Sequence, residues 1–304
     1  MPSSSPPIQL EHLTKRYGKH RGVEDLTIAV EPGEVFGFLG PNGAGKTTTI
    51  RVLMGWLRPT LGVAKTFGID CWRQAARAHR EVGFIPGDLR LYESMGVLEF
   101  LRFTGALHGG VRPGRLEALA ARLDLELRGR IKHLSRGNRQ KVGLVQALMH
   151  EAPLLILDEP SVGLDPLMGV VFTELVREER AAGRTVFLSS HNLSEVERIC
   201  DRVAIIREGR LVALETVDAL KGKRVRQMSV LFRQPIDPRA FEGDGVIVLD
   251  RGERRLRLAV RGDINPVIRR LGSYDVQDLT FDEPDLEDVF LHFYRDEPAE
   301  VASA

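Results

Sequence analysis

The residues best suited to chemistry lie in one glycine-rich stretch, residues 40–48, with the sequence GPNGAGKTT. It satisfies the pattern G-x-x-x-x-G-K-[ST] between an apolar strand, VFGFL, and a helical run, TTTIRVLMG, which is the context that this pattern requires. Gly43 and Gly45 let the backbone turn so that successive N–H groups point at phosphate oxygens. Lys46 supplies a charge to the β- and γ-phosphates, and the Thr47 hydroxyl can bind Mg²⁺. The stretch therefore predicts a phosphate-binding loop at a helix N-terminus.

A second candidate site is the acidic pair Asp158 and Glu159, which ends the apolar run LLIL at residues 154–157. Asp158 would emerge at the carboxyl end of a strand, where open α/β sheets bind their ligands, and could hold Mg²⁺ directly or through water. Glu159 could accept a proton from water that attacks the γ-phosphate. Alone, an apolar strand that ends in Asp-Glu is a weak signal, and the phosphate-binding loop upstream strengthens it.

The elements that must position these residues alternate between strand and helix patterns from residue 8 to about residue 218, as in an α/β sheet. Strands are predicted at residues 8–13, 26–30, 35–39, 82–85, 154–157, 185–189 and 202–207. Helices are predicted at residues 46–55, 97–107, 113–123, 136–149, 166–182 and 193–200.

A change in composition near residue 220 predicts a second, small α+β domain at residues 224–296. The basic segment KGKRVR, residues 221–226, is typical of a linker. The strand patterns that follow lie at residues 227–233, 246–249, 254–260 and 274–279, and the helical patterns at residues 264–271 and 284–294. Residues 1–7 and 297–304 are predicted to be disordered tails.

Composition limits the partners that this chain could have. It has 304 residues, about two domains' worth, and 43 Lys+Arg against 42 Asp+Glu, so its charge predicts no nucleic-acid binding. Cys71 and Cys200 are too few for a disulfide framework or a four-cysteine zinc site, as is usual in a reducing compartment. The apolar runs are far shorter than the ~20 residues that span a bilayer, and the first residues show no secretory signal. We therefore expect a cytosolic protein that serves a membrane only through a partner.

Further motifs stand in an order that resembles the ATP-binding cassette (ABC) ATPases. Residues 134–140, LSRGNRQ, open a predicted helix and are similar to that family's signature motif, usually LSGGQ. Residues 161–165, SVGLD, resemble its D-loop, and His191, after the strand TVFLSS, resembles its switch histidine. Tyr17 matches the aromatic residue that stacks on adenine, and Val23 matches the position that flanks the sugar.

This resemblance covers residues 8 to about 215 and implies an α/β P-loop NTPase fold. The ABC cassette, residues 8–218, would have a RecA-like core, an antiparallel β subdomain and a helical subdomain at about residues 88–150. It implies an ATPase that binds ATP and Mg²⁺ between two cassettes arranged head to tail, because in this family the signature motif lies too far from its own phosphate-binding loop. The partner would be a second copy of the chain or a homologous ATPase.

The same resemblance assigns roles to residues of this chain. Lys46, Glu159 and His191 would be catalytic. The residues expected to contact ATP from the same chain are Tyr17, Val23, Gly40, Pro41, Asn42, Gly43, Ala44, Gly45, Lys46, Thr47 and Thr48. Those expected to contact the partner's ATP are Ser135, Arg136, Gly137 and Asn138. The D-loop residues expected at the dimer interface are Ser161, Gly163 and Asp165. The expected Mg²⁺ ligands are Thr47 and Asp158, with Asp88 as a further candidate.

Two departures from the family pattern bear on the rate of turnover. Gly87 stands after Pro86, where the family has the Q-loop glutamine that touches Mg²⁺ and the attacking water, so either Asp88 or a water molecule would replace it. Arg136 and Asn138 replace the first glycine and the glutamine of LSGGQ. Both variations resemble a branch of bacterial drug and antibiotic exporters.

The resemblance also implies a membrane partner. Residues 92–101 resemble the segment that leads into the helical subdomain and lines a groove for a coupling helix of the membrane subunit. Residues 284–291, PDLEDVFL, are similar to the ending of ATPases of ABC-2 type exporters of drugs, antibiotics and lipids. An ordinary amphipathic helix with Leu286, Val289 and Phe290 on one face would also explain that segment, but the exporter interpretation is favoured because it agrees with the variant signature motif. We expect a peripheral subunit at the cytoplasmic face of the membrane, bound to an ABC-2 type permease on a separate chain.

Other functions remain open on the sequence alone. The chain could serve an exporter of polysaccharide, lipid or sodium, or an importer, and a non-transport ABC ATPase of translation or DNA repair is a further alternative. A nucleotide-binding module without catalysis is suggested by Gly87 and opposed by the presence of Glu159 and His191. The transported compound, its direction, and the choice between homodimer and heterodimer are not encoded in any motif of this chain.

Overall fold

A computed structural model describes residues 5–18, 20–222, 226–241, 243, 246–260 and 263–282. The chain divides into two compact units, Met1–Val217 and Asp218–Ala304. The first unit contains the phosphate-binding loop and both acidic residues, so it is the unit that carries the candidate site.

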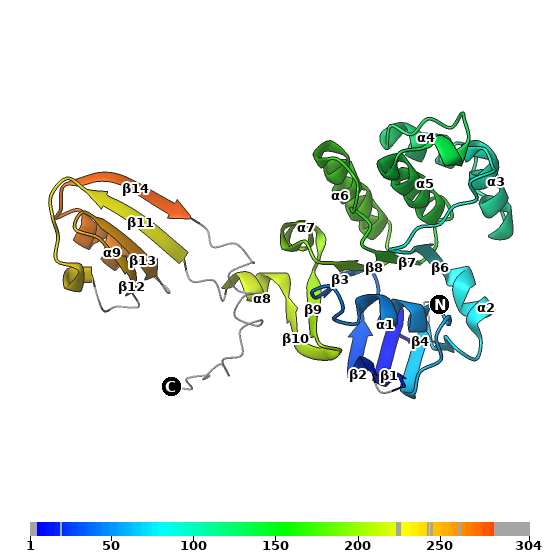
Figure 1. Cartoon of the computed structure of the whole chain (residues 1–304), viewed down its shortest axis with the longest axis horizontal. Helices are drawn as coiled ribbons and strands as arrows, with labels where there is room; N and C mark the ends of the chain where they lie inside the picture. The colour runs from blue at the N-terminus through cyan, green and yellow to red at the C-terminus, as the bar shows by residue number, and fades with distance from the viewer. Residues whose placement is uncertain are drawn as a thin grey trace. The chain divides into compact units, whose positions relative to one another are not determined.

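A six-stranded sheet forms the centre of the first unit, in the order β10-β9-β3-β8-β7-β6 (Figure 1). Its neighbouring strands are parallel except β10, which is antiparallel to β9. The strands are β3 (Val35–Leu39), β6 (Val82–Ile85), β7 (Leu154–Asp158), β8 (Thr185–Ser190), β9 (Arg202–Arg207) and β10 (Arg210–Thr216). Strands β3, β7 and β8 are buried along their whole length, as expected for parallel strands covered on both faces. Their carboxyl ends therefore meet at one edge of the sheet, where such sheets bind ligands.

An antiparallel sheet in the order β2-β1-β4-β5 packs against the central sheet. Its strands are β1 (Ile8–Tyr17), β2 (His20–Val30), β4 (Leu61–Thr66) and β5 (Ile69–Asp70). Apolar residues of both sheets and of helix α1 (Lys46–Leu53) form one core, in which the rings of Phe36 and Phe187 stack at 5.8 Å. The start of helix α1, which closes the phosphate-binding loop, is thus anchored in that core.

Helices complete the first unit, and their ends follow from local sequence. They are α2 (Ala75–Ala78), α3 (Val97–Leu107), α4 (Arg115–Arg122), α5 (Arg136–Leu148), α6 (Pro166–Ala181) and α7 (Leu193–Ile199). Short 3₁₀ helices lie at His79–Glu81 and Ile131–His133. The side chains of Ser135, Asp165 and Asn192 accept backbone N–H bonds at the first turns of α5, α6 and α7, as preferred N-cap residues do.

The second unit has a four-stranded antiparallel sheet in the order β12-β13-β11-β14. Its strands are β11 (Arg226–Phe232), β12 (Val246–Arg251), β13 (Arg255–Val260) and β14 (Val276–Asp282), and its helices are α8 (Val217–Gly222), the 3₁₀ helix Pro238–Phe241 and α9 (Asn265–Leu271). Residues such as Val230, Phe232 and Leu258 are buried in a core of this unit's own. The described part of the second unit is therefore an α+β domain, as the strand and helix patterns predict.

The local predictions agree with the structure best where the hydrophobic pattern is strong. Strands 35–39, 82–85 and 202–207 and helix 97–107 have the predicted ends. Strands β4, β5 and β10 and helix α2 were not predicted. Strand β10 has no fully buried position, and helix α2 and strand β5 are very short.

Two boundary predictions are wrong in part. Pro7, assigned to a disordered tail, is buried, and its carbonyl accepts a hydrogen bond from the Phe67 N–H at 3.2 Å. The predicted linker 221–226 overlaps the end of helix α8 at Gly222 and the start of β11 at Arg226, because a basic composition does not exclude secondary structure. The predicted helix 284–294 and tail 297–304 lie outside the described residues.

Candidate functional site

A cavity of about 560 Å³ lies at the carboxyl ends of the central strands. It is lined by Tyr17, Gly22, Pro41, Asn42, Gly43, Gly45, Lys46, Thr47, Thr48, Arg51, Gly87, Asp88, Glu159, Val162 and His191. The cavity thus brings together the phosphate-binding loop, the predicted adenine-stacking residue, the Q-loop segment, the acidic end of β7 and the histidine after β8. Because these segments are far apart in sequence, only the fold could join them.

Backbone geometry explains the glycines of the phosphate-binding loop. Gly43 and Gly45 have φ of 81° and 109°, in the left-handed region that favours glycine. A Cβ on Gly45 would lie 2.6 Å from the Val23 side chain and 2.8 Å from the Gly22 carbonyl oxygen. The loop can therefore lie against β2 only with glycine at this position, and that contact sets the start of helix α1.

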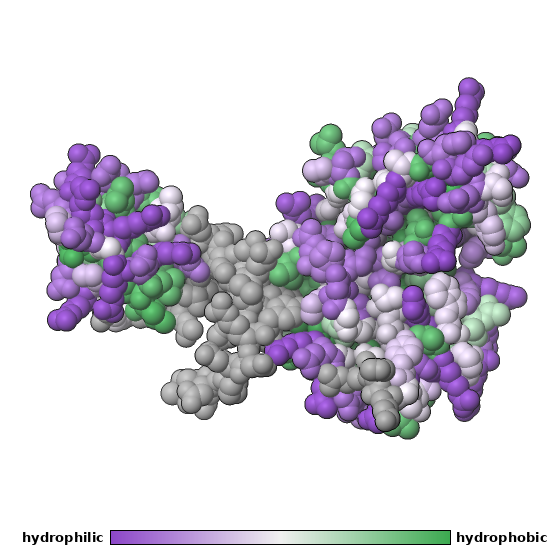
Figure 2. All heavy atoms as spheres, in the orientation of Figure 1, coloured by the Kyte–Doolittle hydropathy of each residue, from purple (hydrophilic) through white to green (hydrophobic). Residues whose placement is uncertain are grey.

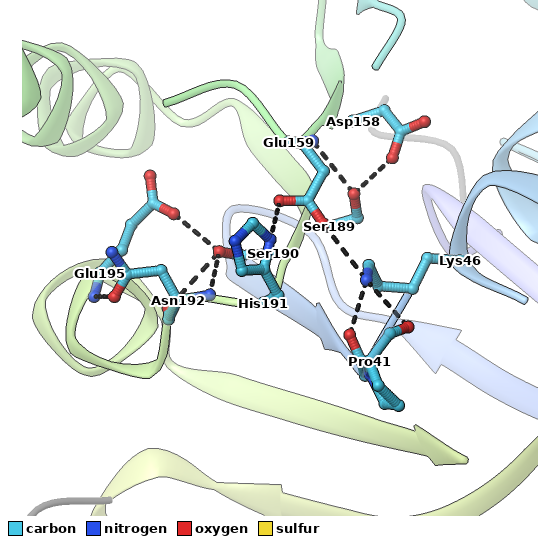
Figure 3. Close-up of polar contacts among 10 residues, drawn as sticks. Pro41, Lys46, Asp158, Glu159, Ser189, Ser190, His191, Asn192 and Glu195 are labelled. Atoms are coloured by element: carbon cyan, nitrogen blue, oxygen red, sulfur yellow. Dashed lines mark hydrogen bonds and ion pairs between the residues drawn. The ribbon is translucent and has the colours of Figure 1, made fainter. Parts of the chain in front are cut away.

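Lys46 is buried and bonded to its own loop. Its Nζ donates to the carbonyl oxygens of Gly40 at 2.6 Å and Pro41 at 3.3 Å (Figure 3). It also lies 3.2 Å from Glu159 Oε1. An ammonium group held in this way is already oriented toward the cavity, and an anionic ligand such as a γ-phosphate could take the place of the carboxylate beside it.

Four polar residues at the ends of β7 and β8 hold one another in place (Figure 3). Asp158 is almost completely buried, and its Oδ1 accepts a hydrogen bond from Ser189 Oγ at 2.5 Å. The Glu159 N–H donates to Ser189 Oγ at 3.1 Å, and Glu159 Oε2 lies 2.7 Å from His191 Nδ1. Glu159 has a φ of 51°, unusual for a residue with a side chain. Because of this backbone conformation, the carboxylates of the adjacent residues Asp158 and Glu159 lie in different parts of the site.

Behind His191, Glu195 in helix α7 forms a buried polar layer. Its Oε2 accepts a hydrogen bond from Ser190 Oγ at 2.8 Å, whereas its Oε1 has no hydrogen-bond partner among the described residues. Burial raises the pKa of Glu195, and the bond from Ser190 opposes that rise. This layer fixes the backbone that carries His191.

The residue predicted to contact adenine lines the cavity, whereas the residue predicted to contact the sugar does not. Tyr17 is 41% exposed and lines the cavity, with its hydroxyl 3.4 Å from Thr48 Oγ1. Val23 is completely buried beneath Gly45, so its assignment beside the sugar is corrected: it supports the loop from below. Gly22 lines the cavity instead, and nothing in its local sequence distinguishes it from a turn glycine.

The Q-loop departure has a direct structural counterpart. A Cβ on Gly87 would lie 3.0 Å from Asp158 Oδ2, so the glycine lets this loop approach the buried carboxylate closely. Asp88 lines the same cavity, but its carboxylate pairs with Arg90 at 3.0 Å. Of the three Mg²⁺ ligand candidates, Thr47 lines the cavity, Asp158 is held at one oxygen by Ser189, and Asp88 pairs with an arginine.

The signature motif and the D-loop lie against each other in the same chain. A Cβ on Gly137 would lie 2.8 Å from the Gly163 carbonyl oxygen, and Gly163 itself faces the Arg136 side chain. Ser135 Oγ accepts the Asn138 N–H at 3.2 Å, and Asp165 Oδ1 accepts the Met168 N–H at 3.0 Å. Among the described residues that line the cavity, none comes from 134–138. The signature residues are therefore placed away from the phosphate-binding loop of their own chain.

Neither cysteine contributes a nucleophile to this arrangement. Both thiols are buried, and burial raises the pKa of Cys71 to about 11 and that of Cys200 well above its usual value. Both thiols therefore remain protonated at neutral pH, in agreement with a structural role.

Sequence reasoning missed the residues that position the predicted ones. Ser189 holds Asp158 and Glu159 together, and Gln140 Nε2 donates to the Pro160 carbonyl at 2.8 Å. Arg51 and Val162 also line the cavity; they lie in the helical run after the phosphate-binding loop and in the D-loop, where neither was assigned a role. The position of Ser189 one strand beyond the acidic pair was a usable signal, since parallel neighbours align their carboxyl ends.

The comparisons with known proteins agree with this geometry. The family model described as "ABC transporter" matches residues 23–162. The chain is 33% identical over 302 residues to the bacitracin transport ATP-binding protein BcrA of Bacillus licheniformis, covering 93% of this chain and 96% of that protein. It belongs to the ABC transporter ATP-binding family. The cassette is also 34% identical to the daunorubicin resistance ATP-binding protein DrrA3 of Streptomyces coeruleorubidus, covering 95% and 96% of the two chains.

Solved structures extend this agreement to the cassette's fold. A structure described as the ATP-binding subunit of an ABC transporter has a TM-score of 0.66 at 34% identity and covers 70% of this chain and 91% of that chain. The dimeric structure of the bacterial ABC transporter cassette MJ0796, at 21% identity and a TM-score of 0.64, shows the fold alone. The prediction of an ABC cassette ATPase is confirmed. Across the described ranges, no helix combines the length and apolar character needed to cross a membrane.

Proposed function

We propose that this cassette is the ATP-hydrolysing subunit of an exporter that moves a drug, antibiotic or lipid-like compound through a separate membrane permease. The observation that carries the proposal is the convergence of Lys46, Glu159 and His191 on one cavity, within a chain that matches drug-exporter ATPases along nearly its whole length. A second candidate is an exporter of another compound, because the Nod factor export ATP-binding protein I of Paraburkholderia xenovorans is 34% identical over 93% of this chain.

The chemistry follows from the positions of the site's own residues. The loop N–H groups and Lys46 would bind the β- and γ-phosphates, and Tyr17 would stack on adenine. Glu159, aimed into the cavity beside His191, would accept the proton of the attacking water while His191 orients the carboxylate. Displacement of Glu159 from Lys46 by the γ-phosphate would free the carboxylate for that role.

Thr47 and Asp158 fit a magnesium site. Thr47 lines the cavity, and Asp158 is buried with one oxygen fixed by Ser189. Among the described residues no ion pair involves Asp158, and a buried carboxylate of this kind is a hard oxygen ligand such as Mg²⁺ prefers. Bound there, Mg²⁺ would neutralise charge on the β- and γ-phosphates. Asp88 pairs with Arg90 through Oδ2 and would be a further candidate ligand.

Two cassettes are needed to complete the site in this proposal. Ser135, Arg136, Gly137 and Asn138 lie away from their own cavity and are supported in that position by the D-loop. A head-to-tail partner, either a second copy or a homologous ATPase, would present its signature residues to the γ-phosphate and exclude water on closure. Ser161, Gly163 and Asp165 would contact the partner at the same interface.

The helical subdomain offers a surface for the permease. Tyr92 and Phe103 are exposed, and their rings lie 6.4 Å apart around the segment predicted to meet a coupling helix. On the face drawn in Figure 2, apolar side chains gather beside α3 among hydrophilic ones. Exposed aromatic clusters of this kind support protein–protein contact. We propose an ABC-2 type permease as the partner, which would hold the cassette at the cytoplasmic face of the membrane.

The test compares wild type with Glu159→Gln and Lys46→Ala in ATP hydrolysis, nucleotide binding and oligomeric state. Glu159→Gln should retain ATP binding, lose at least about 100-fold in hydrolysis, and accumulate as an ATP-bound dimer in size-exclusion chromatography. Lys46→Ala should abolish hydrolysis. A Glu159→Gln variant that remains monomeric with ATP while hydrolysing normally would refute the mechanism. Export is tested by co-expressing the cassette with the membrane protein encoded beside it and measuring drug resistance, which Lys46→Ala should remove.

A further inference from the structure

Glu159 is one of several described non-glycine residues with a positive φ, and among them it is the one that lines the cavity. Its φ of 51° lies in the left-handed region, which costs a residue with a side chain roughly 1–3 kcal/mol and persists only where the surroundings hold it. On its N-terminal side, the Glu159 N–H is fixed by the carbonyl oxygen of Ser189 at 3.2 Å and by Ser189 Oγ at 3.1 Å. These two hydrogen bonds hold the N-terminal side of the turn that carries Glu159.

On the other side of the turn, the Val162 N–H donates to the Glu159 carbonyl oxygen at 3.2 Å, and Gln140 adds a bond from outside the turn. Its Nε2 donates to the carbonyl oxygen of Pro160, the residue directly after Glu159, at 2.8 Å. Gln140 lies in helix α5, one turn beyond the signature residues at the start of that helix. The turn that carries Glu159 is therefore held from two sides, once by strand β8 and once by the signature helix.

The signature helix and the D-loop make further close contacts near the same point. The backbones of Gly137 and Gly163 approach so closely that a Cβ on Gly137 would lie 2.8 Å from the Gly163 carbonyl oxygen. The Arg136 side chain covers Gly163. Close packing of this kind leaves little room for the helix N-terminus to shift without moving residues 160–163. A displacement of the signature motif would thus reach the Glu159 turn through Gln140.

We infer that Gln140 is a positioning residue that couples the signature motif to the catalytic glutamate of the same chain. The inference rests on the proposed head-to-tail dimer, in which the signature residues contact the partner's ATP while Glu159 serves the ATP of its own chain. Binding of one nucleotide would then set the orientation of the glutamate at the other. Such coupling between two sites is reciprocal, so the dimer would hydrolyse ATP cooperatively.

The experiment measures ATP hydrolysis against ATP concentration for wild type, Gln140→Met and Gln140→Lys. Met preserves the length of the side chain and removes the donor, whereas Lys restores a donor to the Pro160 carbonyl. Gln140→Met should lower kcat about fivefold, the size expected for one lost hydrogen bond, and bring the Hill coefficient from above 1 toward 1. ATP binding should stay within about twofold of wild type, and Gln140→Lys should recover most of kcat. Gln74→Met, an exposed glutamine outside the site, is the matched control.

A second measurement separates positioning from general damage to the fold. Gln140→Met is combined with Glu159→Gln, and single-turnover hydrolysis is followed. If Gln140 acts through Glu159, its substitution has no further effect once the carboxylate is gone; fully additive losses would overturn the inference.

Each of three further results would overturn the role of Gln140. The first is a Gln140→Met variant with wild-type kcat and Hill coefficient, and the second is a Gln140→Lys variant as slow as Gln140→Met. The third is a loss of ATP binding in parallel with kcat. Wild-type protein that neither binds nor hydrolyses ATP would instead overturn the proposed function, so the two failures are distinguishable.

Discussion

At the scale of single residues, Gly87 explains how this cassette departs from the usual Q-loop. The space that a side chain would need is occupied by Asp158, whose Oδ2 would lie 3.0 Å from a Cβ at this position. Asp158 cannot easily turn aside, because its other oxygen is bonded to Ser189 at 2.5 Å. The glycine is therefore part of the packing around the proposed Mg²⁺ ligand, and a glutamine could not simply be restored.

Gly87→Ala should lower Mg²⁺-dependent ATP hydrolysis about tenfold, because the added Cβ displaces Asp158 by a fraction of an ångström. Gly87→Gln carries the same Cβ and should be at least as slow. The measurement is kcat in a Mg²⁺ titration, and Gly169→Ala, where a Cβ meets open space, is the control. Wild-type kcat and Mg²⁺ dependence in Gly87→Gln would contradict this account of the loop.

At the scale of elements, ion pairs join helix α4 of the helical subdomain to helix α6, which begins at the D-loop. Glu179 in α6 is 2% exposed and pairs with Arg115 of α4 and with Arg184. Nearer the surface, Arg122 of α4 pairs with Glu174 and Glu178. We expect the buried pairs of Glu179 to matter more for stability than the exposed pairs of Arg122, because a buried charge that loses its partner is far more costly than an exposed one.

Glu179→Gln should lower the free energy of unfolding by about 3 kcal/mol, because the largely buried Arg115 loses its counter-charge and Arg184 loses one of two, keeping its pair with Glu151. Glu178→Gln, at the exposed pair, should cost less than about 1 kcal/mol. Urea unfolding of the two variants followed by circular dichroism provides the comparison. Equal losses would mean that burial of the pair does not determine its contribution.

At the scale of the whole molecule, stability should depend on pH through a stacked histidine pair. The rings of His108 and His150 lie 4.0 Å apart, and neither ring nitrogen of His150 has a hydrogen-bond partner among the described residues. Burial, with a smaller contribution from His108, lowers the pKa of His150 to about 4. The folded chain thus binds fewer protons at His150 than the unfolded chain between about pH 6.5 and 4. Its contribution to stability is present above that window and is lost as the pH falls through it.

Between pH 7 and pH 5 we expect His150 to remove about 1 kcal/mol from the free energy of unfolding, a value reduced for partial solvent exposure. His150→Phe should flatten this dependence, and the exposed residue His133 provides the control His133→Phe. Glu34 and Glu195 act in the opposite sense, because burial raises the pKa of both and their protonation at low pH favours the folded state. Denaturant unfolding at several pH values tests the difference between the variants, and parallel curves for wild type and His150→Phe would exclude the histidine as its source.

Features that depend on neighbouring residues could be predicted from the order of amino acids. The loop at residues 40–48 and the end of β7 were predicted in place, because a glycine-rich turn before a helix and an acidic pair after an apolar strand are set by neighbouring residues. The order of the motifs sufficed to predict the ABC cassette. The two compact units and the α+β character of the second follow equally from patterns along the chain.

Contacts between side chains of distant segments became known from the folded chain alone. Val23 belonged to the expected sugar contact by position in the sequence, yet it supports Gly45 from below. Ser189, which bonds to both Asp158 and Glu159, and Gln140, which bonds to Pro160, belong to other elements than their partners. Burial and hydrogen bonding between distant segments arise when sheets and helices pack, and a linear pattern of residue types carries no distances across that packing.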